Sequence, residues 1–160
     1  MGASDWAYFV PYQTDLESAL QALRQNVFAN GEYYKPADWF RRLHEDNIID
    51  QQRLTTLLES VSSTPEPQTI EELIQMRGLD GTHSIIDITR VSTELDYGVV
   101  TPLSEQEYSD VFGTDTPTHE MVEQKADHLV TMRERWQGVY VLVYEGDVPN
   151  EIFFAGFSGD

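Results

Sequence analysis

The N-terminal third of the chain changes from a strand pattern to a helical one. Residues 5–12 are aromatic and β-branched, and they predict a first strand. Residues 14–17 have the form of a capping box, after which apolar residues recur every three or four positions up to Asn30 and predict a helix. Apolar stripes of the same period predict two further helices, over residues 37–45 and 50–61.

The rest of the chain mixes short helical and strand patterns. Capping boxes open short helices at Thr69 and Ser104. Runs of β-branched and aromatic residues predict four strands, over residues 84–92, 98–103, 138–145 and 151–157. We expect the first two of these strands to pair as an antiparallel hairpin. Helical spacing of apolar residues predicts one long helix over residues 116–136.

Runs of helices and runs of strands, rather than strict alternation, predict an α+β fold. We expect a mostly antiparallel sheet of about five strands with about five to six helices packed on it. Residues 62–68 contain two prolines and form a weak linker, but the ~60 residues before them would bury little surface alone. We therefore expect a single domain over residues 1–160. The inward positions of the patterns predict a core of Leu16, Leu20, Leu23, Val27, Phe28, Ile86, Ile88, Val141, Val143, Ile152 and Phe154.

Composition narrows the function classes. The chain carries 28 acidic and 10 basic residues, a formal net charge of −18, which opposes binding to nucleic acid or to an anionic membrane. No apolar run approaches the ~20 residues of a membrane span, and no charged-then-apolar leader is present. The chain has no cysteine, so it has no disulfide or thiol nucleophile. We expect a cytoplasmic protein. We also expect a folded core, since 40% of the residues are hydrophobic.

The acidity is densest in one stretch, where no Lys or Arg interrupts the acidic residues. This acidic stretch, our candidate binding surface, comprises Glu94, Asp96, Glu105, Glu107, Asp110, Asp115, Glu120 and Glu123. A merely solvated surface or salt adaptation would also account for it, and the two lysines against eight arginines fit salt adaptation. The functional alternative is a surface complementary to a basic partner.

Two constellations could carry chemistry. His119 and Glu123 stand one helical turn apart and resemble part of the zinc-protease signature HExxH, but Glu123 replaces the second histidine and no third ligand is evident. We therefore expect no metal and no cofactor. His83 and Asp87 would lie on one face of the strand expected at residues 84–92, where successive positions are about 7 Å apart, beyond direct hydrogen-bond reach. The motifs GxGxxG, GxxxxGK[ST] and GxSxG are absent.

With no catalytic signature, the first hypothesis is an acidic protein-binding module. It would be an inhibitor or immunity-like protein that masks the basic surface of a partner such as a toxin or a nucleic-acid enzyme. The second hypothesis is a small-molecule enzyme with a His/carboxylate site. The third is an accessory subunit of a larger assembly that docks through the aromatic residues at positions 6–39. The sequence leaves the oligomeric state open.

Overall fold

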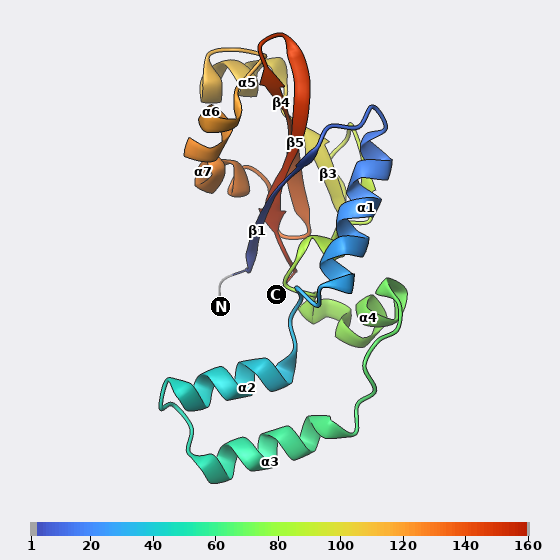
Figure 1. The fold of residues 1–160 in the computed structure, drawn as a ribbon, viewed down its shortest axis with the longest axis vertical. Helices are drawn as coiled ribbons and strands as arrows, with labels where there is room; N and C mark the ends of the chain where they lie inside the picture. Colours follow the sequence, from blue (N-terminus) through green and yellow to red (C-terminus); the bar gives the residue numbers. More distant parts are fainter. Residues whose placement is uncertain (1–2, 160) are drawn as a thin grey trace.

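The computed structural model describes residues 3–159, and a five-stranded sheet organises them (Figure 1). The strands lie in the order β1-β5-β4-β3-β2. Their bounds are β1 Asp5–Pro11, β2 Arg90–Val91, β3 Val99–Pro102, β4 Gln137–Glu145 and β5 Val148–Phe157. The α-helices are α1 Leu16–Ala29, α2 Pro36–Glu45, α3 Gln51–Ser62, α4 Ile70–Arg77, α5 Glu105–Phe112, α6 His119–Gln124 and α7 Ala126–Val130. Gly78–Asp80 and Ile85–Asp87 form short 3₁₀ turns.

Alternation along the strands gives the sheet two apolar faces. Tyr8 and Phe154 contact the cluster under α1 and α4, whereas their neighbours Phe9 and Phe153 contact the cluster under α5, α6 and α7. The Trp6 ring packs on Gly138 and Gly156, which pair across β4 and β5. A side chain at either glycine would overlap this ring. The sheet is thus the middle layer of three.

These findings confirm the predicted α+β class and the mostly antiparallel sheet of five strands. Seven α-helices lie within residues 3–159, whereas at most six were expected. The additional helix arises because the long helix expected over residues 116–136 is divided into α6 and α7. The predicted core is also confirmed, since nine of its members are buried, while Leu16 and Phe28 are half-buried against the cluster under α1 and α4. None of the helices in the described part is long and apolar enough to cross a membrane.

The strand expected at residues 84–92 is wrong except at its end. Ser84 caps a 3₁₀ turn, because its hydroxyl accepts from the N–H of Ile86 (3.3 Å). Only Arg90–Val91 joins the sheet, and it runs parallel to β3. The antiparallel hairpin expected there is therefore also wrong, and β3 itself pairs parallel to β4.

The long helix expected over residues 116–136 is wrong as well. It is two short helices, α6 and α7, interrupted at Lys125, and the chain leaves the helix after Val130. Tertiary contacts draw the following segment toward the sheet, since the Trp136 carbonyl accepts from the N–H of Gly98 (2.8 Å) and the Trp136 ring stacks on Tyr97 (centroids 4.8 Å apart). Trp136 takes a positive φ of 63° there.

The helices α2 and α3 do not pack on the sheet. They pair with each other as a hairpin that projects from the end of the molecule that holds α4 (Figure 1). Among their residues only Leu54 is buried. The expectation that every helix lies on the sheet is wrong for this pair.

Candidate functional site

An edge of the sheet without a neighbouring strand begins where β3 ends. β3 pairs with β4 only as far as Tyr140, whereas β4 continues to Glu145. The chain's own groups occupy the edge beyond: the N–H of Leu142 donates to the Tyr108 hydroxyl (3.3 Å), and the N–H of Tyr144 donates to the Pro117 carbonyl (2.8 Å). Because both donors are used, this edge does not offer a ladder for an added strand.

An arginine fixes α5 beside this edge. The Arg133 side chain is 10% exposed and donates to both carboxylate oxygens of Glu107, at 2.7 and 3.2 Å. Its Nε donates to the Thr101 hydroxyl on β3 (3.0 Å). Glu107 also closes a capping box with Ser104 at the start of α5. Hydrogen bonding to Arg133 holds the pKa of Glu107 below its ordinary value, so this carboxylate is charged at neutral pH.

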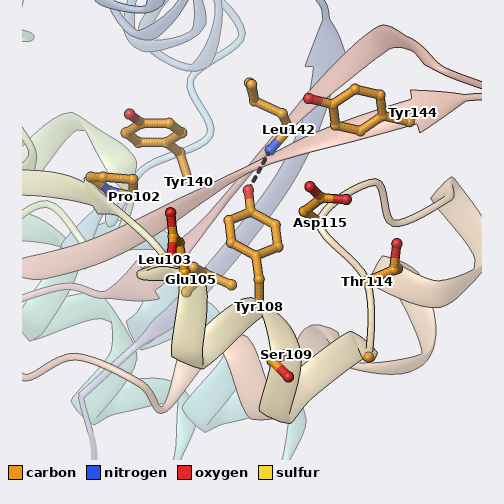
Figure 2. Close-up of a pocket in the computed structure, with 11 residues that line it drawn as sticks. Pro102, Leu103, Glu105, Tyr108, Ser109, Thr114, Asp115, Tyr140, Leu142 and Tyr144 are labelled. Atoms are coloured by element: carbon orange, nitrogen blue, oxygen red, sulfur yellow. Dashed lines mark hydrogen bonds between the residues drawn. The ribbon is translucent and has the colours of Figure 1, made fainter.

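Between α5 and the edge of β4 lies an open groove of about 680 Å³. We call it the tyrosine groove, and it is lined by Pro102, Leu103, Glu105, Tyr108, Ser109, Gly113, Thr114, Asp115, Tyr140, Leu142 and Tyr144. Figure 2 shows the rings of Tyr140, Tyr108 and Tyr144 along the groove, with the Glu105 and Asp115 carboxylates on either side of Tyr108 in this view. The lining residues include no Lys, Arg or His.

The chemistry of the tyrosine groove suits a cation. Burial raises the pKa of Tyr108 to about 12 and also raises that of Tyr140, so both phenols are neutral at pH 7. Neutral aromatic faces attract a guanidinium or ammonium group, and carboxylates pair with it through charge-assisted hydrogen bonds. Glu105 and Asp115 have no lysine or arginine beside them in the groove to compete for that role.

The structure brings only part of the acidic stretch to this groove. Glu105 and Asp115 line it, while Asp110 lies on α5 and accepts from Gln106 (2.8 Å). Glu107 is engaged by Arg133, so we leave it out of the binding contact. The remaining members lie elsewhere: Glu94 and Asp96 in the loop between β2 and β3, where Asp96 pairs with Arg90 at 2.6 Å, and Glu120 and Glu123 on α6.

Tyr140 and Tyr144 were not among the residues singled out from the sequence. In the run GVYVLVYE they are indistinguishable from ordinary strand residues. Their alternation with Val141 and Val143 does place them together on one face of β4, away from the valines, which are buried. What the sequence does not reveal is that β3 stops short and leaves this edge without a neighbouring strand.

The structure gives His119 partners on the sheet. Its Nδ1 lies 2.7 Å from Oε2 of Glu151 on β5, and its ring stacks on Phe9 (centroids 4.1 Å apart). These contacts fasten the start of α6 to the sheet, next to an open cavity of about 490 Å³ that Glu120 also lines. Within residues 3–159, no group of three or more His, Asp or Glu side chains is arranged to hold a metal ion.

The relation expected between His83 and Asp87 is also wrong, because the two do not share a strand face. His83 adopts a positive φ of 57°, contacts the Ser4 hydroxyl (2.9 Å) and stacks on Tyr34. Asp87 is buried and accepts from the N–H of Thr82 (2.8 Å) and the Ser158 hydroxyl (2.5 Å). The Asp87 carboxylate therefore links Ser158 to the turn that contains Thr82.

No protein-family model, curated protein or solved structure matches this chain.

Proposed function

We propose that this chain is a protein-binding module, an inhibitor or immunity-like protein, that masks a basic surface of another protein. The tyrosine groove is the observation that carries the proposal, since it combines two carboxylates with three aromatic rings and no cationic side chain. The formal net charge of −18 supports it further, because a strong field of one sign accelerates encounter with an oppositely charged partner.

In this proposal the groove receives an arginine or lysine side chain from the partner. Its cationic head lies between Glu105 and Asp115, and its aliphatic stem lies against the tyrosine rings. Because the N–H groups at the β4 edge are already engaged, the recognition works through side chains rather than through strand addition.

The test measures binding of a fluorescent nona-arginine peptide to the wild type and to two variants of equal charge. The groove variant carries Glu105→Gln and Asp115→Asn. The control variant carries Glu59→Gln and Glu66→Gln, two exposed positions on and after α3, at the other end of the molecule (Figure 1). We expect the groove variant to weaken binding about tenfold or more and the control by less than about twofold.

Equal weakening in both variants would show that the acidity acts only as a diffuse field and that the groove is not the contact. The wild-type association rate should also fall as salt rises, because the Debye length shrinks from ~30 Å at 0.01 M to ~10 Å at 0.1 M. A salt-independent rate would contradict electrostatic capture altogether.

A further inference from the structure

A cavity of about 300 Å³ lies where the base of the α2–α3 hairpin meets α4. Its wall combines residues around the start of α2, the end of α3, the linker that follows α3 and the end of α4. The lining residues are Lys35, Pro36, Ala37, Val61, Thr64, Pro65, Glu66, Pro67, Met76 and Arg77. Most of these side chains are apolar, so the cavity suits a ligand with an apolar body.

Arg77, in the last turn of α4, brings an incompletely satisfied guanidinium group to this cavity. Its Nε is buried and has no hydrogen-bond partner within residues 3–159. The guanidinium lies over the ring of Tyr34, with Cζ 5.3 Å from the ring centroid, and a ring face accepts no strong hydrogen bond. A buried N–H without an acceptor destabilises the fold, and more so in a charged group. An acceptor supplied from outside the chain would therefore complete this site.

Lys35 adds a second cation to the same wall. Its Nζ lies 5.2 Å from the centroid of the Tyr33 ring. Glu66 is the one carboxylate among the lining residues, and it is exposed on the linker. The wall of this cavity is thus net positive in a chain whose formal net charge is −18.

The charge of the rest of the chain limits the kind of anion that this cavity would hold. A field of one sign repels a ligand of the same sign in proportion to the ligand's charge. A singly charged carboxylate is therefore favoured over a doubly charged phosphate. Arginine suits a carboxylate, since its planar group donates two parallel hydrogen bonds to the two oxygens.

From these observations we infer that the cavity between the hairpin and α4 binds a small apolar molecule that carries a single carboxylate. The carboxylate accepts from Arg77 and Lys35, and the apolar body lies among the prolines, Val61 and Met76. A dry cavity of about 150 Å³ holds benzene, so a cavity of about 300 Å³ suits a body of two fused rings. A ligand held there contacts both the hairpin and α4 and so joins the hairpin to the rest of the molecule.

Isothermal titration calorimetry with two probes of equal size tests this inference. Naphthalene-2-carboxylate carries the proposed charge, whereas naphthalene-2-carboxamide has the same rings and no charge. We expect saturable binding of the carboxylate at one site per chain, and binding of the carboxamide that is about tenfold weaker or more.

Three variants that each remove one positive charge then locate the site. Arg77→Gln and Lys35→Gln alter the wall of the cavity, and Arg53→Gln is the matched control, exposed on α3 and outside the cavity. We expect Arg77→Gln to weaken binding of the carboxylate about tenfold or more and Lys35→Gln about threefold or more. Arg53→Gln should change the affinity less than about twofold, because an exposed charge outside the site acts only through the screened field.

Three results would overturn the inference. The first is no saturable binding of naphthalene-2-carboxylate to the wild type up to about 5 mM. The second is equal affinity for the carboxamide, which would show adventitious apolar binding, and the third is a loss in Arg53→Gln as large as in Arg77→Gln. If the circular dichroism spectrum of Arg77→Gln differs from that of the wild type, Lys35→Gln and the carboxamide decide the question.

Discussion

The pair formed by Arg133 and Glu107 gives the most direct test of how the tyrosine groove is built. In a Glu107→Gln variant the guanidinium, 10% exposed, loses its anionic partner while its bonds to Thr101 and to main-chain carbonyls remain. Removing one member of a fully buried pair costs about 3–5 kcal/mol, whereas an exposed pair contributes at most about 1 kcal/mol. Glu107 is 30% exposed, which places this pair between the limits, and we expect a loss of about 2 kcal/mol.

The assay is thermal and urea denaturation followed by circular dichroism. A loss of about 2 kcal/mol lowers the melting temperature of a domain of this size by about 4–8 °C. Asp110→Asn is the matched control on the same helix, since its carboxylate accepts only from the exposed Gln106, and it should stay within about 0.5 kcal/mol of the wild type.

The loss should also depend on pH. The folded state holds the pKa of Glu107 below its ordinary value, so the pair's contribution is fully present above the unfolded value of about 4.3 and is lost as the pH falls through the folded value. The difference between wild type and Glu107→Gln should therefore shrink below about pH 4. A Glu107→Gln variant as stable as Asp110→Asn at pH 7 would refute the stabilising role of the pair formed by Arg133 and Glu107.

Two further predictions concern the groove wall and the sheet. Burial raises the pKa of Tyr108 to about 12, so the stability it confers is present below about pH 10 and is lost as the pH rises toward 12. Tyr108→Phe should flatten the alkaline decline of the unfolding free energy between those values, and an unchanged decline would contradict this assignment. At Gly156 a methyl group would overlap the Trp6 ring and the main chain at Gly138, so Gly156→Ala should cost about 2 kcal/mol or more in urea denaturation. Gly156 is not among the glycines of positive φ, so the expected loss comes from the overlap rather than from backbone strain, and a Gly156→Ala variant as stable as the wild type would argue against the overlap.

Much of the fold follows from local pattern. The strands β4 and β5 and the helix α1 lie within a few residues of their predicted bounds, because each has a long, unbroken period and clear ends. The two residues between β4 and β5, Gly146 and Asp147, are a strong local turn signal of the same kind. For these elements, tertiary contacts and local preference agree.

The errors occur where distant contacts override the local pattern. Residues 84–88 are hydrophobic enough for a strand, but Asp87 is bound by Ser158, which is 71 residues away along the chain. The helical spacing of apolar residues continues to Trp136. The helix nevertheless ends before Trp136, because Arg133 binds Thr101 and Glu107 instead. No pattern within a short window contains these partners.

The candidate site was visible from the sequence only as charge. The acidic stretch was recognisable because it lacks basic residues, but which of its carboxylates are free depends on the position of Arg133 and Arg90. The capping box marks Glu107 as the partner of Ser104, but no local pattern shows that Arg133, 26 residues away, also binds Glu107 or that Glu105 faces the groove. The groove itself arises from the difference in length between β3 and β4, which only their pairing reveals.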